Sequence, residues 1–320
     1  MFDRVILHLG ATKTGTTAIQ TALHHASGSL AEQGTIYPAL GNVRGDDSRV
    51  NGNGQVFKFI KRQASNINGR RSRLRALLQD IVGESVGHTL LFSAEGLQRI
   101  SVDDIQLLKT ELERYGPLEI VYFVRHVVDH ALSQYAEYIR RRRLRDEFSE
   151  FAKSYTVPFL DVLTTWSNIC GADSVKTYVY DPSQDAIANF FKLIGAEPPA
   201  EKTIVHRSLS SEELALMRWL NHRIKDRLTL AKFAQSLSRH PNLSTKKLRA
   251  TSDDLRNLTA NNANIVEQLN RDFVTEGELK MASDKIIDDT PSEDIDLHEQ
   301  GALLLTAVHE ALNYASRQPR

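Results

Sequence analysis

The sequence predicts an α/β protein whose parallel sheet carries helices on both faces. Short apolar runs rich in β-branched and aromatic residues alternate with helical patterns as far as about residue 195. This alternation favours a parallel sheet, because each crossover between parallel strands places a helix on one face of the sheet. From about residue 211 the patterns are mostly helical. We therefore predict a three-layer core over residues 1–210 and a helical C-terminal subdomain over residues 211–320, packed on that core.

Each expected element has its own local signal. Apolar runs predict strands at residues 5–9, 88–92, 118–124 and 175–180. Apolar residues at helical spacing predict helices from residue 18, over 128–139, 148–170 and 184–194, and from 211 onwards. An acidic, turn-rich stretch at 284–298 predicts a loop, and residues 302–314 predict a final helix.

Composition narrows the class of protein. The 320 residues include 40 basic and 40 acidic side chains, and 41% are hydrophobic. The balanced charge does not favour a nucleic-acid partner. The single cysteine, Cys170, excludes an intrachain disulfide and fits a reducing compartment. Because the first apolar run is too short for a signal peptide and no run is long enough to span a membrane, we predict a cytoplasmic protein. The oligomeric state stays open.

The most informative segment joins the first strand to the first helix. It reads Gly10-Ala11-Thr12-Lys13-Thr14-Gly15-Thr16-Thr17. The N–H groups at a helix N-terminus attract anions, so this layout favours phosphate binding. In ATP and GTP loops the lysine follows the second glycine, but here Thr16 takes that place and the lysine is Lys13. A nucleoside triphosphate needs that lysine and Mg²⁺, so we expect a smaller anion and no metal. The alternative is a turn that binds nothing.

This loop resembles the 5′-phosphosulfate loop of sulfotransferases that use 3′-phosphoadenosine 5′-phosphosulfate (PAPS). Gly34-Thr35-Ile36-Tyr37-Pro38 is similar to the second strand of bacterial members. The resemblance covers about the first 220 residues in segments and implies a P-loop-like sulfotransferase fold. It implies PAPS as donor and 3′,5′-bisphosphoadenosine as product. It also implies cofactor contacts from Thr12, Lys13, Thr14, Gly15, Thr16 and Thr17.

Two later segments extend the resemblance. The strand over 118–124 ends at Arg125, and Ser133 follows eight positions on, in the next helix. Sulfotransferases hold the 3′-phosphate with an arginine and a serine at this spacing, and arginine can grip a phosphate with two donors. Without the loop, a solvated arginine and serine would be the simpler interpretation. Residues 205–210 resemble a late bacterial motif, although His206 stands where an asparagine is usual, and this implies Arg207 as a further cofactor contact.

A candidate base follows the strand over 88–92. Glu95 lies just beyond that strand, and in open α/β sheets ligands bind outside the carboxyl ends of the strands. A carboxylate there can take the proton of an acceptor hydroxyl. Some sulfotransferases use a glutamate at this strand end. Glu95 could instead cap the next turn or pair with Arg99, and His126 or His130 is the rival base.

Together these patterns predict an enzyme, a PAPS-dependent sulfotransferase with Lys13 and Glu95 as catalytic residues. The resemblance implies an acceptor hydroxyl, less favourably an amine, on a saccharide or glycolipid. One alternative is a kinase using ATP and Mg²⁺, with Asp181 as metal ligand, and another is a non-catalytic glycan-binding module. The arginines at 140–143 and 145 are interpreted first as a solvated helix end. The second interpretation is a basic edge for an anionic glycan or for peripheral contact with a membrane.

Overall fold

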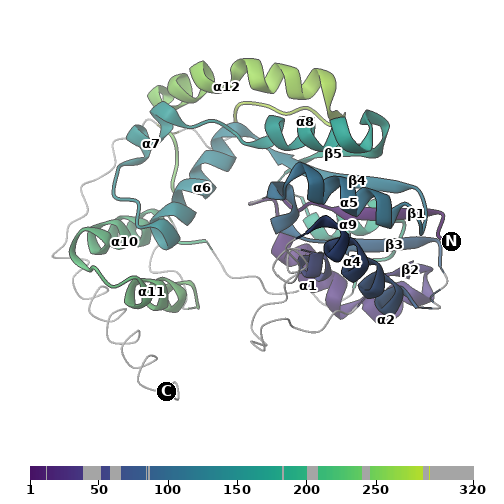
Figure 1. The fold of residues 1–320 in the computed structure, drawn as a ribbon. Helices are drawn as coiled ribbons and strands as arrows, with labels where there is room; N and C mark the ends of the chain where they lie inside the picture. The colour runs from purple at the N-terminus through teal and green to yellow at the C-terminus, as the bar shows by residue number, and fades with distance from the viewer. Residues whose placement is uncertain are drawn as a thin grey trace. The chain divides into compact units, whose positions relative to one another are not determined.

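The computed structural model describes residues 1–11, 13–38, 52–57, 66–83, 85, 87–181, 184–199, 208–239, 246–283 and 288, and it confirms the predicted α/β fold class (Figure 1). Six strands form one parallel sheet in the order β2-β3-β1-β4-β5-β6. The strands are β1 (Arg4–His8), β2 (Thr35–Ile36), β3 (Thr89–Ser93), β4 (Leu118–Arg125), β5 (Val175–Tyr180) and β6 (Val274–Glu276).

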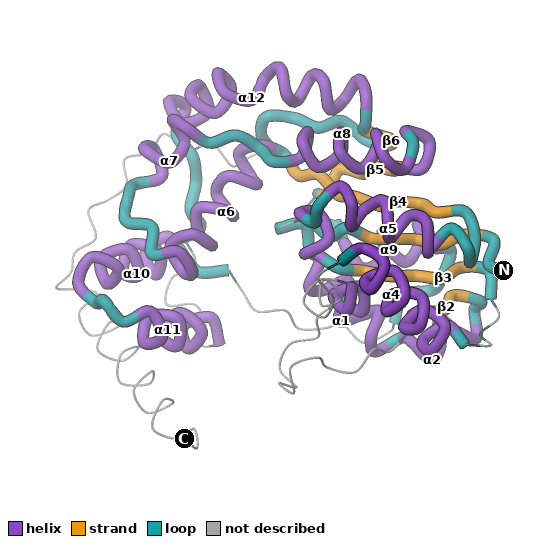
Figure 2. Tube along the Cα trace, viewed as in Figure 1, coloured by secondary structure: helices purple, strands orange, loops and turns teal. Residues whose placement is uncertain are grey.

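Helices make up most of the remaining described structure (Figure 2). The earlier ones are α1 (Thr16–His25), α2 (Ser27–Glu32), α4 (Ile67–Val82), α5 (Val102–Leu112), α6 (Val127–Arg142) and α7 (Phe148–Ser154). The later ones are α8 (Phe159–Cys170), α9 (Ala186–Ile194), α10 (Ser211–Arg223), α11 (Arg227–Arg239) and α12 (Ser252–Asp272). Three short 3-10 helices complete the described elements: η1 (Asn53–Gln55), η2 (Glu95–Arg99) and η3 (Ala172–Ser174).

The strand register brings several strand ends to one edge of the sheet. β1 pairs with β3 as far as their last residues, His8 opposite Ser93. β4 pairs with β5 in the same way, Arg125 opposite Tyr180. Because parallel strands share a direction, the segments that follow β1, β3, β4 and β5 all leave from the carboxyl edge. This edge is where open α/β sheets bind ligands.

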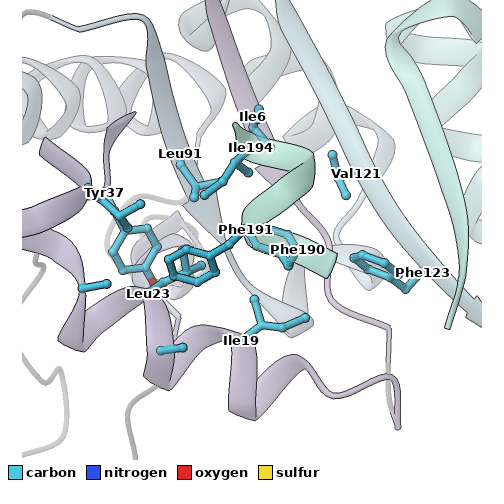
Figure 3. Close-up of a cluster of buried hydrophobic side chains, with 13 residues drawn as sticks. Ile6, Ile19, Leu23, Tyr37, Leu91, Val121, Phe123, Phe190, Phe191 and Ile194 are labelled. Atoms are coloured by element: carbon cyan, nitrogen blue, oxygen red, sulfur yellow. The ribbon is translucent and has the colours of Figure 1, made fainter. Parts of the chain in front are cut away.

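One face of the sheet is covered by α1 and α9 (Figure 3). Alternate strand residues point to opposite faces, and Ile6, Leu91 and Val121 supply the strand side of this layer. The helices contribute aliphatic and aromatic side chains, all buried: Ile19, Ala22 and Leu23 from α1, and Phe190, Phe191 and Ile194 from α9. His8 and Ser93 lie two residues beyond Ile6 and Leu91, so they continue the same rows towards the carboxyl edge.

The opposite face is covered by α4, α5 and α8, with α5 packed against both of the others. Tyr122, which alternates with Val121 along β4, packs its ring against Phe159 at the start of α8. Burial raises the pKa of Tyr122, and its hydroxyl donates to Oε1 of Gln98 at 3.2 Å. Both faces of the sheet are therefore filled, which agrees with the continuous apolar runs of the central strands.

Two predicted elements differ from the observed ones, and one observed strand was not predicted. The helix expected over 148–170 is two helices, α7 and α8, because Pro158 cannot continue the first and instead stands at the N-cap of the second. The strand expected at 34–38 is only Thr35–Ile36. β6 was not predicted: it pairs with β5 from within the stretch expected to be helical.

The described chain forms two compact units whose segments interleave. The first contains residues 1–125, 158–205 and 265–279, and the second contains 126–157, 206–264 and 280–320. The predicted division into residues 1–210 and 211–320 is a different partition, and it stays a prediction. The predicted loop at 284–298 and helix at 302–314 lie outside the described residues, apart from residue 288.

In the second unit, α6 and α10 are joined through the arginine run. Arg143, in a left-handed conformation at the end of α6, donates to the carbonyl oxygens of Asn221 and Lys225, each at 3.1 Å. Arg145 donates to the same Asn221 oxygen, also at 3.1 Å. Arg141 pairs with Glu137 at 2.6 Å, and the Arg142 guanidinium lies 4.3 Å from the centroid of the Tyr138 ring. These four arginines are therefore engaged in interactions within their own unit.

Two reciprocal hydrogen bonds close the N-terminus of α10. Ser210 accepts from the Glu213 N–H at 3.2 Å, and the Glu213 carboxylate accepts from the Ser210 N–H at 2.8 Å. This reciprocal pair is a capping box. Over the described residues, every helix is too short or too polar to serve as a membrane span.

Candidate functional site

The loop after β1 is held in shape by its own threonines. The Thr14 and Thr16 hydroxyls both donate to the Ala11 carbonyl, at 2.9 and 3.0 Å, and both residues are buried. At Gly10 a Cβ would stand 2.2 Å from Cγ2 of Thr16. The loop therefore closes tightly over this glycine. Since these two hydroxyls are used internally, the anion donors that the loop can offer are mainly its backbone N–H groups and Lys13.

Two loop residues have left-handed backbones. Gly15 has φ +73° and stands at the N-cap of α1. Lys13 has φ +69°, which is unusual for a residue with a side chain. Such strain, about 1–2 kcal/mol for an L-residue, persists when the surroundings over-determine the conformation, and it concentrates at functional sites. The half-buried Lys13 is therefore held in place by the fold rather than by its own preference.

The N-terminus of α1 opens onto the same loop. The Ile19 N–H donates to the Gly15 carbonyl at 3.1 Å, which starts the intrahelical bonds. The N–H groups of Thr16, Thr17 and Ala18 come before it and stand outside the bonding pattern of the helix. With the helix dipole behind them, they are suited to bind a phosphate.

Arg125, at the end of β4, lies directly against the loop. Its Nη1 donates to the Lys13 carbonyl at 2.9 Å. Its guanidinium lies 5.5 Å from the centroid of the Tyr180 ring, which is within cation–π range. A Cβ at Gly15 would come within 3.1 Å of Cε2 of Tyr180, so the tyrosine packs on the loop as well. Two predicted anion-binding residues, far apart in sequence, are thus neighbours at this edge.

Glu95 follows β3 at the same edge. It begins η2, and the intervening Ala94 N–H donates to the His8 carbonyl at 2.9 Å. The chain after β3 is therefore tied to the end of β1, two residues before Gly10. Glu95 is half-buried. A half-buried carboxylate on the rim that carries the loop is suited to general base work.

Buried polar side chains that sequence reasoning missed lie beneath this rim. His8 Nδ1 is 2.9 Å from Ser93 Oγ, and Gln20 Nε2 donates to the same Oγ at 3.1 Å. Burial lowers the pKa of His8 to about 3, so the imidazole is neutral at neutral pH and supplies no positive charge. One signal was present in the sequence: Gln20 is a polar residue next to Ile19 in the apolar stripe of α1.

The rival histidine bases belong to the second unit. His126 Nδ1 accepts from the Lys280 N–H at 3.1 Å, so the neutral ring carries its proton on Nε2. That arrangement leaves the ring poorly suited to take another proton. His130 is fully buried, with Nδ1 hydrogen-bonded to the Tyr155 hydroxyl. Within this unit both histidines serve structural contacts.

The N-terminus of α6 is covered by its own chain. The N–H groups of Val127 and Val128 donate to the carbonyls of Lys280 and Met281, at 3.2 and 2.8 Å. Ser133, half-buried on this helix, belongs to the second unit. Thr12 and Arg207 lie outside the described residues. The cofactor contacts assigned to Ser133, Thr12 and Arg207 therefore stay predictions.

Replacing Gly15 with alanine is expected to damage the loop more than its backbone strain alone. The left-handed conformation costs an L-residue about 1–2 kcal/mol, and the new methyl would press on Tyr180 and Ala186. Gly195→Ala is the matched control, because Gly195 also has a left-handed backbone, with φ +75°, but no atom lies within 4 Å of an added Cβ. We expect both variants to lose stability in urea unfolding, but only Gly15→Ala to lose phosphate binding measured by calorimetry. Equal binding in the two variants would contradict a cradle at Gly15.

The chain is similar to a solved structure. No family model matches the chain, and no curated protein matches it. Among solved structures, a sulfotransferase from Alicyclobacillus acidocaldarius is 15% identical, with a TM-score of 0.35. The match covers 69% of this chain and 92% of that one. In the described part of the chain, His, Cys, Asp and Glu side chains form no cluster of three or more suited to a metal.

Proposed function

We propose that this protein is a sulfotransferase that moves a sulfuryl group from PAPS to an acceptor hydroxyl. The observation that carries the proposal is the contact between Arg125 Nη1 and the Lys13 carbonyl. This contact brings together two cationic residues, Lys13 in the loop after β1 and Arg125 at the end of β4, beside the N-terminus of α1. Two cations beside a row of backbone N–H groups suit an anion with two separated charges.

The residues present fit the cofactor's charges. The N–H groups of Thr16, Thr17 and Ala18 would hold the 5′-phosphate, with Lys13 beside the sulfate end. Arg125 would hold the 3′-phosphate. A guanidinium has five N–H donors, and a group of this kind can serve a backbone carbonyl and a phosphate together. Contacts from Ser133, Thr12 and Arg207 would add to this set.

Bound PAPS would supply an activated sulfuryl group, and the chain's residues have separate tasks around it. Glu95 takes the proton from the acceptor hydroxyl as that oxygen becomes bonded to sulfur. The Lys13 ammonium stabilises the negative charge that grows on the departing phosphate oxygen. Arg125 orients the nucleotide and also supports the backbone of Lys13. The neutral His8 holds no charge in these steps. The saccharide or glycolipid nature of the acceptor is proposed from the sequence resemblance.

The test is a comparison of ligands by thermal shift. Ligands that bind only the native state stabilise it by about 2.7 kcal/mol at a hundredfold excess over Kd. We expect 3′,5′-bisphosphoadenosine to raise the melting temperature by several degrees, more than AMP or than ATP with Mg²⁺. A larger shift with ATP and Mg²⁺ would favour the kinase alternative. If equilibrium dialysis detected no binding of the bisphosphate, the proposal would be wrong.

Arg125→Gln sharpens the same experiment. Both 3′,5′-bisphosphoadenosine and AMP would use the loop, so damage to the loop weakens both equally. Only the bisphosphate has a 3′-phosphate, and a charge-assisted bond contributes about 1.5–3 kcal/mol. We therefore expect the ratio of the two affinities to fall at least about tenfold in Arg125→Gln. An unchanged ratio would show that Arg125 does not hold the 3′-phosphate.

A further inference from the structure

The buried side chains below the loop form a continuous hydrogen-bonded chain. The Gly52 N–H donates to Oε1 of Gln20 at 3.1 Å, and Nε2 of Gln20 donates to Ser93 Oγ at 3.1 Å. Ser93 Oγ lies 2.9 Å from His8 Nδ1. All three side chains are nine-tenths or more buried. This network, His8–Ser93–Gln20–Gly52, links β1, β3, α1 and the segment that begins at Gly52.

Counting donors and acceptors fixes the direction of the network. Since a backbone N–H can only donate, the Gly52 bond sets Gln20 Oε1 as acceptor and leaves Nε2 to donate. Ser93 Oγ then accepts from Gln20, and among the described residues His8 Nδ1 is the partner left for its hydroxyl proton. His8 consequently carries its ring proton on Nε2, which is buried and has no partner in the described part of the chain. Each side chain of the network therefore donates or accepts a hydrogen bond that an apolar side chain could not make.

Asn53 adds hydrogen bonds between the segment that begins at Gly52 and one edge of β3. We call these bonds and the network together the attachment. β2 pairs with β3 at Thr89 and Leu90, and within the described ranges no strand pairs with this edge beyond Leu90. There the Asn53 side chain accepts from the Ser93 N–H at 2.8 Å and donates to the Leu91 carbonyl at 3.1 Å. The fit is close, because a Cβ at Gly52 would stand 2.0 Å from the Ser93 carbonyl oxygen. One side-chain amide thus satisfies two backbone groups of β3, as a paired strand would.

The network lies between the two parts of the proposed site. Gln20 is on α1, whose N-terminus is the phosphate-binding end of the loop. Ser93 is the last residue of β3, two positions before Glu95. We propose that Ser93 and Gln20 are positioning residues that hold Glu95 at a fixed distance from the loop. This inference rests on the proposed function for its catalytic consequence, but not for the attachment itself.

The attachment can be tested by amide hydrogen exchange on the full chain. Gln20→Met keeps the length of the side chain and removes both polar ends, and Ser93→Ala removes the hydroxyl. We expect exchange to become at least about tenfold faster at Gly52 in Gln20→Met and across 93–95 in both variants. Thr177→Val is the control: its buried hydroxyl has no partner among the described residues, so exchange at 93–95 stays at the wild-type rate. Unchanged exchange in both network variants would overturn the proposal, whatever reaction the protein catalyses.

The catalytic consequence is read from kinetics in the same variants. We expect kcat for sulfuryl transfer to fall at least about tenfold, with KM for PAPS and affinity for 3′,5′-bisphosphoadenosine within threefold of wild type, because the loop itself is intact. Ser93→Thr, which keeps the hydroxyl, should recover most of kcat. Faster exchange with unchanged turnover would overturn the positioning of Glu95. If Ser93→Ala did not fold, a comparison of kcat between Gln20→Met and Ser93→Thr would test the positioning of Glu95 in its place. A wild-type protein without transfer activity would contradict the proposed function, while the exchange result would still decide the attachment.

Discussion

Lys13→Met is expected to reduce kcat for sulfuryl transfer by about 10²–10³-fold, the loss typical when one preorganised charge-stabilising donor is removed. The ammonium group acts where charge grows on the departing phosphate oxygen, so its removal affects the transition state more than the bound cofactor. The measurement is steady-state transfer with PAPS, together with calorimetry of 3′,5′-bisphosphoadenosine. Affinity for that product should fall by less than kcat does, because its 5′-phosphate, which keeps the departing oxygen, is still held by the loop N–H groups.

Two further variants separate the effect of the Lys13 charge from the effect of its backbone strain. Lys192→Met removes an equivalent positive charge from the exposed end of α9 in the same unit, and it should leave transfer at the wild-type rate. Lys13→Gly removes the ammonium and also the strain of φ +69°. We expect it to be as inactive as Lys13→Met, with stability within about 1 kcal/mol of wild type, because relief of strain offsets the added chain entropy of glycine. Transfer by Lys13→Met within threefold of wild type would contradict the role of Lys13.

The elements with local signals were predictable from the sequence. The run from Val5 and the run ending in Arg125 are strands within one or two residues of the expected bounds. Gly15 marked the loop, because glycine readily adopts the left-handed conformation found there. Lys13 gave no such signal, since lysine has no preference for that conformation. Its backbone is set by surroundings that include Arg125, 112 residues away in the chain.

The elements without local signals depend on distant partners. β6 is three residues, Val-Thr-Glu, partly or largely exposed, and it becomes a strand through pairing with the edge of β5. His8 occupies an apolar run, and its partner Ser93 is 85 residues later. Asn53 binds Ser93 from 40 residues before it. Sequence periodicity reports which face is buried, but it does not report which polar groups meet inside that face.

Glu95→Gln is expected to lower kcat by about 10²–10⁴-fold, the usual contribution of a positioned general base. The amide keeps the size of the side chain but cannot accept the hydroxyl proton, so binding of 3′,5′-bisphosphoadenosine should stay within threefold. Glu113→Gln, an exposed carboxylate in the same unit, is the matched control and should retain full transfer. The measurement is single-turnover transfer to the acceptor, which isolates chemistry from product release.

His126→Gln distinguishes Glu95 from the rival base. His126 Nδ1 already accepts the Lys280 N–H, so a proton from the acceptor could be taken only after that bond breaks. We therefore expect His126→Gln to cost less than about tenfold in transfer, well below the loss expected for a missing base. The reverse result, with Glu95→Gln near wild type and His126→Gln inactive, would move the base to the histidine. In that case the network below Glu95 would hold the strand end without serving proton transfer.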